Sequence, residues 1–206
     1  MIESILKPGL EDQLIFLGDF INKGPDSKKV IDYIMDLNSA GFDIQSVMGN
    51  HDKLLLDLKN NRIDIRQFEE KGGDQTLKSF DARSCKDIPG KYFKFIEGLS
   101  QYLIIDNYII VHAGINFDSA DPWNDFESMR TIRNYKVDEN VQSGYRRIIH
   151  GHQASTLQEI LNKVLDEESV TLNLDNGCVY KGSEDAGNLF VLNLTDMSFH
   201  VLPCLD

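Results

Sequence analysis

The chain has 206 residues, compatible with one domain and a sizeable core, and its 41% hydrophobic content is ordinary for a globular protein. Its formal net charge of −12 argues against a nucleic-acid-binding surface, and no apolar run is long enough to cross a membrane. A phosphorylated substrate is not excluded, since a bound metal can reverse the field locally. Three unpatterned cysteines and a first segment unlike a signal peptide predict a cytoplasmic protein.

The first half of the chain alternates apolar strand-like runs with helical patterns. A short lead-in over residues 1–13 precedes a strand at 14–17, and a helix that opens at Pro25-Asp26-Ser27 is stopped by Gly41. The next strand, at 44–48, is followed by a helix at 53–59. Residues 60–100 are mixed and mostly helical, and we expect a cap over one edge of a site, with its aromatic residues in the core.

The second half is richer in strands. A hairpin is predicted at 102–105 and 108–111, and a loop-rich stretch at 114–140 contains Arg130 and Arg133. A strand at 147–150 precedes a helix that Ser155-Thr156 caps and that runs through 165. Three further strands are predicted at 170–174, 189–194 and 198–202, and Asp175 indicates a structural turn.

Four predicted strands end abruptly in small polar clusters. The clusters are Gly18-Asp19, Gly49-Asn50-His51-Asp52, His112-Ala113-Gly114 and His150-Gly151-His152. Glycine lets the backbone turn sharply there, and open α/β sheets bind ligands at the carboxyl ends of their strands. Oxygen and imidazole ligands together suit Mn, Fe, Zn or Ni. A shared metal site explains the pattern better than four unrelated structural residues.

Taken in order, the segments GDFINKGPDS, GNHD, HAG and HGH resemble the motifs of the calcineurin-like metallophosphoesterases. Within them the chain is most similar to a bacterial serine/threonine phosphoprotein phosphatase. The resemblance runs from residue 14 to about 202 and implies an α/β fold, a sandwich of two mixed β-sheets flanked by helices, in a single domain over 1–206. The pattern alone supports only an α/β chain of one domain.

The resemblance also implies a metal centre. Asp19 matches the carboxylate that bridges two metals in the family, and Asn50, His112 and His152 match the ligands that complete the second metal. We expect divalent ions, with Mn ahead of Fe, Zn or Ni. The resemblance implies that metal-bound hydroxide would attack phosphorus, and we therefore expect a metal-dependent phosphoric ester hydrolase.

Four more positions are assigned through the same resemblance. His51 matches the general acid that protonates the leaving group, and Asn22 stands where the family has the Asp that orients this histidine. Lys23 and Arg133 match the phosphate-binding arginines. Outside these roles, we interpret His150 as a residue behind the ligands that shares a strand face with His152, and Arg130 as a solvated loop charge.

Three departures from the family pattern are compatible with two explanations. An Asp-x-His-Gly segment that would supply two ligands of the first metal lies upstream in the family and is missing here, so one metal is the alternative to two. Asn22 replaces an aspartate, and Lys23 replaces an arginine that could hold phosphate bidentately. The chain is either a shortened form of a longer enzyme or a degenerate member.

The function expected from this resemblance is that of a phosphomonoesterase, most similar to serine/threonine protein phosphatases. The alternatives are a dinucleoside polyphosphate hydrolase and a catalytically impaired pseudophosphatase that binds one metal and phosphate. The expected partner is a phosphorylated protein or a small phosphoester, with no nucleic acid and no membrane. The substrate, the native metal and the oligomeric state stay open.

Overall fold

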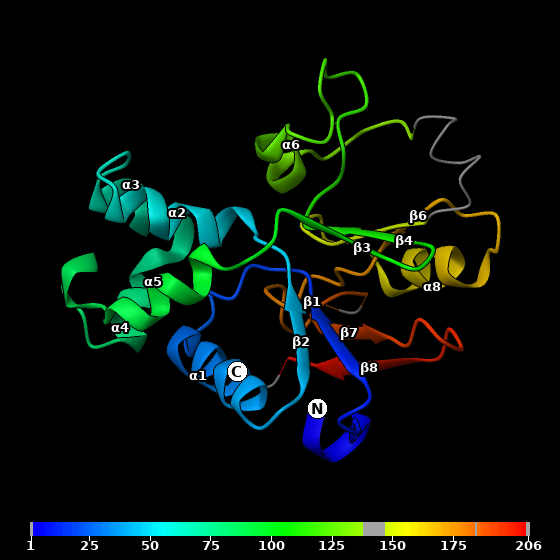
Figure 1. Ribbon diagram of the computed structural model, residues 1–206, viewed down its shortest axis with the longest axis horizontal. Helices are drawn as coiled ribbons and strands as arrows, with labels where there is room; N and C mark the ends of the chain where they lie inside the picture. Colours follow the sequence, from blue (N-terminus) through cyan, green and yellow to red (C-terminus); the bar gives the residue numbers. More distant parts are fainter. Residues whose placement is uncertain (1, 138–146, 184, 205–206) are drawn as a thin grey trace. The chain divides into compact units, whose positions relative to one another are not determined.

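The computed structural model describes residues 2–137, 147–183 and 185–204 (Figure 1). The chain separates after Ser100 into two compact units, which we call the N-terminal unit and the C-terminal unit. Each unit has its own buried core. The single domain over 1–206 stays a prediction, and the two units are described separately.

The N-terminal unit contains one parallel strand pair. After a π-helical turn, η1 (Ile2–Leu6), strand β1 (Gln13–Phe16) pairs with β2 (Asp43–Ser46), and Leu14 lies opposite Ile44. Helix α1 (Ser27–Ser39) connects them, as a parallel pair requires a crossover. Both strands and the helix lie where the hydrophobic pattern predicts them, within two residues at each end.

Short helices make up the rest of the N-terminal unit (Figure 1). They are α2 (Asn50–Lys59), α3 (Ile65–Phe68), η2 (Glu69–Gly73), α4 (Asp74–Ser79), η3 (Cys85–Asp87) and α5 (Gly90–Glu97). Their apolar sides form one core in which Phe68, Tyr92 and Ile96 are fully buried. The expectation that the aromatic residues of this stretch belong to the core is confirmed.

A polar cluster joins α1 to α5. The Asp32 carboxylate lies 2.6 Å from Lys28 Nζ and 3.0 Å from Lys91 Nζ, and the Tyr92 hydroxyl donates to it at 2.9 Å. The bond from Lys28 contributes most to lowering the pKa of Asp32 to about 2, with further bonds from Lys91 and Tyr92. The cluster therefore fixes the two helices at a charged contact.

The C-terminal unit contains a mixed four-stranded sheet and a separate strand pair. The order is β3-β4-β5-β6, with the hairpin β3 (Tyr102–Ile105) and β4 (Tyr108–Val111) followed by parallel β5 (Arg147–His150) and β6 (Thr171–Asn173). Strands β7 (Asn188–Leu192) and β8 (Phe199–Pro203) are antiparallel. Parallel pairing brings the carboxyl ends of β4 and β5 to one edge.

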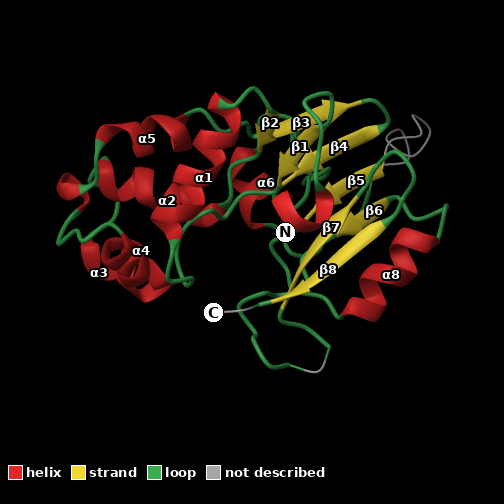
Figure 2. Cartoon of the chain, turned by 90° about the horizontal axis from the view of Figure 1, so that it is seen from below, coloured by secondary structure: helices red, strands yellow, loops and turns green. Residues whose placement is uncertain are grey.

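Two helices among the described residues accompany these sheets. Helix α8 (Leu157–Leu165) packs beside β6 (Figure 2) and is capped by Thr156, whose side chain accepts from the Glu159 N–H, as predicted. The short helix α6 (Phe126–Thr131) falls inside the predicted loop-rich stretch, whose last residues, 138–140, lie outside the described ranges. The helices and the three sheets found in the described residues together confirm the α/β class. No helix in the described ranges combines the length and apolarity needed to span a membrane.

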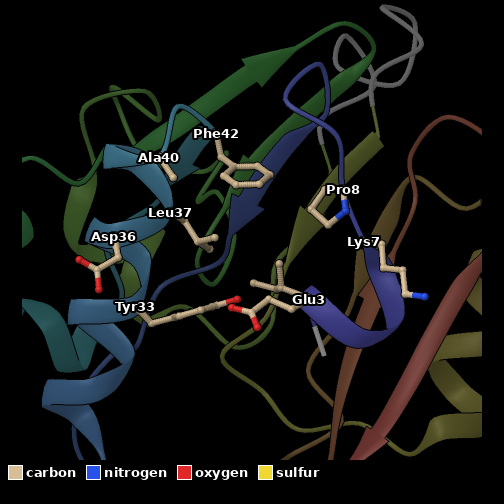
Figure 3. Close-up of a pocket in the computed structure, with 9 residues that line it drawn as sticks. Glu3, Lys7, Pro8, Tyr33, Asp36, Leu37, Ala40 and Phe42 are labelled. Carbon is tan, nitrogen blue, oxygen red and sulfur yellow. The ribbon is translucent and has the colours of Figure 1, made fainter.

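A pocket of about 560 Å³ lies in the N-terminal unit at η1 and α1 (Figure 3). Apolar side chains such as Leu37 and Phe42 line it together with Glu3, Lys7 and Tyr33. Burial raises the pKa of Tyr33, and the neighbouring Glu3 carboxylate raises it further. None of the predicted site residues lines this pocket.

Candidate active site

The loop that follows β1 has an unusual backbone. Gly18, Asp19, Asn22 and Lys23 have φ values of 89°, 57°, 72° and 60°. Residues other than glycine adopt this left-handed region only at a cost in free energy, so the surroundings must hold the loop in place. At Gly18 a Cβ would lie 2.6 Å from the Gly49 nitrogen, which excludes larger residues there.

The carboxylate of Asp52 holds this loop. Its Oδ2 accepts from the backbone N–H groups of Asp19 at 2.7 Å and Gly49 at 2.9 Å, and its Oδ1 accepts from Phe20 at 2.9 Å. Asp52 is completely buried, where a charge persists only with such partners. The sequence analysis gave Asp52 no role, although an acidic third residue of a helix commonly accepts the N–H of the N-cap residue, here Gly49.

Helix α2 begins at Asn50, three residues earlier than predicted. The prediction was wrong because it treated the whole GNHD segment as a loop, whereas Asp52 caps the helix from inside its first turn. The backbone N–H of His51 donates to the Asp19 carboxylate at 3.0 Å. A helix N-terminus favours an anion, so α2 stabilises the negative charge of the predicted bridging ligand. Asp19 and Asn50 therefore meet at the start of one helix.

The predicted catalytic pair is formed in the N-terminal unit. Asn22 and His51 are both buried, and Asn22 Nδ2 lies 3.0 Å from His51 Nδ1. The hydroxyl of Thr76, on α4, donates to Asn22 Oδ1 at 2.8 Å. Lys23 is exposed, and its backbone N–H donates to the Gly72 carbonyl at 3.0 Å. Thr76 is a second residue that sequence reasoning missed, since no local pattern links it to Asn22.

Two predicted ligands lie together in the C-terminal unit. His112 follows β4, His152 follows β5, and their ring centroids are 5.1 Å apart. The Gly151 N–H donates to the His112 carbonyl at 2.8 Å, which ties the two strand ends together. The imidazoles are thus neighbours, as expected at adjacent carboxyl ends of a parallel pair.

His150 and His152 do not share a strand face, contrary to the prediction. Strand β5 ends at His150, and His152 has a φ of 70°, so the two histidines do not continue one extended strand. His150 Nδ1 lies 3.2 Å from the Gly151 carbonyl, and its ring lies 5.9 Å from that of Tyr135. Burial, with a smaller contribution from His112, lowers the pKa of His150 to about 4, so it is neutral at pH 7.

The two arginines differ in their surroundings. Arg130 was predicted to be solvated, but only 6% of it is exposed. That prediction was wrong, because α6 turns Arg130 inward, where its guanidinium contacts the Gln101 side chain and lies 3.3 Å from Glu127. Arg133 follows α6 and is exposed.

Asp175 accepts the Gly177 N–H at 2.8 Å, in keeping with its interpretation as a structural turn.

The predicted ligands fit a divalent metal chemically. They comprise one carboxylate, one amide oxygen and two imidazoles, a mixture that suits Mn, Fe, Zn or Ni better than Ca or Mg. Asp19 is held with its charge satisfied by α2, and His112 and His152 lie side by side. Each unit thus presents its ligands in an ordered arrangement.

Comparison with known proteins agrees with these features. Residues 1–190 match the model of the family described as "Calcineurin-like phosphoesterase". A bis(5'-nucleosyl)-tetraphosphatase (asymmetrical), PrpE, of Bacillus velezensis is 23% identical over 188 residues, covering 81% of this chain and 70% of the relative. The PrpE of Anoxybacillus flavithermus is 27% identical over 192 residues, covering 82% and 72%.

A solved structure titled as a putative diadenosine tetraphosphatase superposes with a TM-score of 0.68 at 20% identity, covering 98% of this chain and 85% of that one. At this identity the similarity establishes the fold, which is that of the metallophosphoesterases. Membership implies divalent metal ions as cofactors. The chain belongs to the calcineurin-like phosphoesterase family and is a metal-dependent phosphoric ester hydrolase.

Proposed function

We propose that this chain hydrolyses a phosphate linkage with the help of divalent metal ions, Mn²⁺ first, held by Asp19, Asn50, His112 and His152. The order at the start of α2 supports this, since the His51 N–H bond fixes the Asp19 carboxylate that would be shared between two metals. When bound, the metals would activate water and neutralise the phosphoryl oxygens. One metal is the alternative to two.

We assign the remaining roles to four side chains. His51, held beside Asn22, faces the leaving group, and this hydrogen-bonded pair is the observation that carries the catalytic proposal. Lys23 and Arg133, both exposed, bind phosphate oxygens by charge. Lys23 acts as a point charge without the fork of an arginine, so its contribution depends on ionic strength.

For the substrate we propose a dinucleoside polyphosphate. The two PrpE relatives are bis(5'-nucleosyl)-tetraphosphatases and cover most of this chain. A phosphoprotein is the second candidate, supported by the order GDFINKGPDS, GNHD, HAG and HGH. The acidic chain favours neither over the other, and we keep the cytoplasm as the proposed location because its cysteines are few and unpatterned.

The decisive experiment compares turnover of diadenosine tetraphosphate, a phosphoserine peptide and p-nitrophenyl phosphate by the full chain during titration with Mn²⁺. We expect Mn²⁺-dependent hydrolysis with the highest kcat/KM on diadenosine tetraphosphate. His51→Ala should lower kcat by about 10²-fold or more, the scale of losing a group that acts on the leaving oxygen. His200→Ala, on β8, serves as the control for removing a histidine.

Two outcomes would contradict the proposal. Preference for the phosphopeptide would favour the phosphoprotein phosphatase alternative. A folded chain that binds Mn²⁺ but hydrolyses none of the three substrates at any metal concentration would support the pseudophosphatase instead.

A further inference from the structure

Thr76 is a fully buried polar residue placed against the predicted catalytic pair. It lies on α4, and 0% of its surface is exposed. Its Oγ1 accepts the backbone N–H of Asn22 at 2.8 Å, donates to Asn22 Oδ1 at 2.8 Å and lies 3.3 Å from the Ser27 hydroxyl. One hydroxyl thus contacts both the backbone and the side chain of Asn22.

These contacts decide which end of the Asn22 amide faces His51. A carboxylate accepts hydrogen bonds at both oxygens, whereas an amide accepts at one end and donates at the other. The Thr76 oxygen already accepts from the Asn22 backbone, and the Ser27 hydroxyl can donate to it as well. With Ser27 as the donor in that contact, the single Thr76 proton goes to Asn22 Oδ1, and the amide nitrogen faces His51 Nδ1, as in the structure.

The orientation of the amide also selects the tautomer of His51. Asn22 Nδ2 is a donor, so His51 Nδ1, 3.0 Å away, must accept. In a neutral imidazole the proton then resides on Nε2. An aspartate at position 22 would accept from Nδ1–H instead and would stabilise an imidazolium by its charge.

We propose that Thr76 is a positioning residue that fixes Asn22 with its amide nitrogen toward His51 Nδ1, so that His51 presents Nε2–H as a hydrogen-bond donor. This inference rests on the proposed function, in which His51 faces the leaving group. It assigns a role to a residue of α4 that contacts neither phosphate nor metal ligand in the proposed reaction. It also gives a reason why an amide can replace a carboxylate at position 22.

The chemical consequence concerns the leaving group. In the hydrolysis, a water oxygen bonds to phosphorus, the water proton passes to solvent, and the electron pair of the broken P–O bond stays on the leaving oxygen. His51 Nε2–H donates a hydrogen bond to that oxygen without giving up its proton. We therefore expect fast hydrolysis when the leaving group is stable as an anion, such as a phosphate or nitrophenolate, and slow hydrolysis when it is an alkoxide.

The first test is the tautomer of His51, read by ¹⁵N NMR of the metal-free full chain at one pH where the ring is neutral. We expect Nδ1 without a proton in the wild type and in Thr76→Ser, and a shift of the proton toward Nδ1 in Thr76→Val and in Asn22→Asp. Thr171→Val, the same exchange in β6, should change nothing. A wild-type chain with its proton on Nδ1 would overturn the proposal even if Thr76→Val failed to fold.

The second test is the leaving-group dependence of kcat/KM with Mn²⁺, using phosphate esters from nitrophenyl to alkyl. We expect a steep dependence in the wild type, and about a tenfold or larger relative gain on the alkyl ester in Asn22→Asp, within the range of general acid catalysis. Equal dependence in the two chains would refute the inference about His51 while leaving the proposed function intact. No turnover of any ester would refute the proposed function, and the tautomer measurement would still decide the role of Thr76.

Discussion

At the scale of single residues, Asp52 joins the loop after β1 to the start of α2 through three backbone N–H groups. In Asp52→Asn the amide nitrogen would have to face at least one of these donors. We expect a loss of about 1–3 kcal/mol in the free energy of unfolding, the cost of a buried donor without an acceptor. Urea unfolding measures it.

The matched control is Asp57→Asn in the same helix. Asp57 pairs with Lys53 and Arg62, contacts that water partly screens, and we expect a loss of no more than about 1 kcal/mol. If both variants lost the same stability, the bonds of Asp52 would not matter more than a surface ion pair.

The roles of Asp52 and Thr76 were not predicted from the sequence. The resemblance of the polar segments to a known family was enough to name Asn22 and His51, and the structure places them 3.0 Å apart. Asp52 lies in the GNHD segment, but its role could not be predicted, because its three partners include residues 32 and 33 positions away. The contact of Thr76 with Asn22 could not be predicted, since only the packing of α4 brings the two residues together.

At the scale of elements, the contact between α1 and α5 depends on pH through Asp32. Its pKa is lowered from an ordinary value near 3.8 to about 2, so the stabilisation is complete above pH 4 to 5 and is lost as the pH falls through 2. We expect the free energy of unfolding to fall by about 1–2 kcal/mol from this group alone, discounted for the partial exposure of the side chain. Urea unfolding between pH 6 and 2 measures the change.

The variant Asp32→Asn isolates this contribution. It should be less stable than the wild type at pH 6, and the difference between the two chains should shrink toward pH 2. Asp26→Asn, which removes an exposed pair with Lys29 at the start of the same helix, is the control. A difference between wild type and Asp32→Asn that stayed constant with pH would contradict this account.

The elements themselves were largely predictable, for a physical reason. Strands β3, β4 and β5 lie within residues that alternate or repeat β-branched side chains between turn residues, and all three were predicted with the observed bounds. Helix α2 was predicted too short, because its cap comes from a side chain inside the helix. Helix α6 was missed because its six residues show too little periodicity, and Arg130 was misjudged with it.

At the scale of the whole molecule, the proposed metal site makes stability depend on metal concentration. The four ligands come from positions 19 to 152, so the unfolded chain would bind a metal weakly. At a free Mn²⁺ concentration 100 times its Kd, we expect a gain of about 2.7 kcal/mol and a higher Tm, reversed by a chelator. Thermal unfolding with and without Mn²⁺ tests this.

His112→Ala and His152→Ala should each abolish most of this shift, while His200→Ala should retain it. A shift that survived in both ligand variants would place the metal elsewhere in the chain. No shift in the wild type would remove the support for a metal held by these four residues.

The hydrogen bond between Thr76 and Asn22 has a further consequence for how the chain folds. It joins residues 54 positions apart, and closing a loop of that length costs entropy that only the docking of α4 can offset. In refolding, helical signal should therefore recover before enzymatic activity does. A nascent chain that has emerged only as far as α2 already contains Asn22 and His51, but it must wait for α4 before the two are held in register.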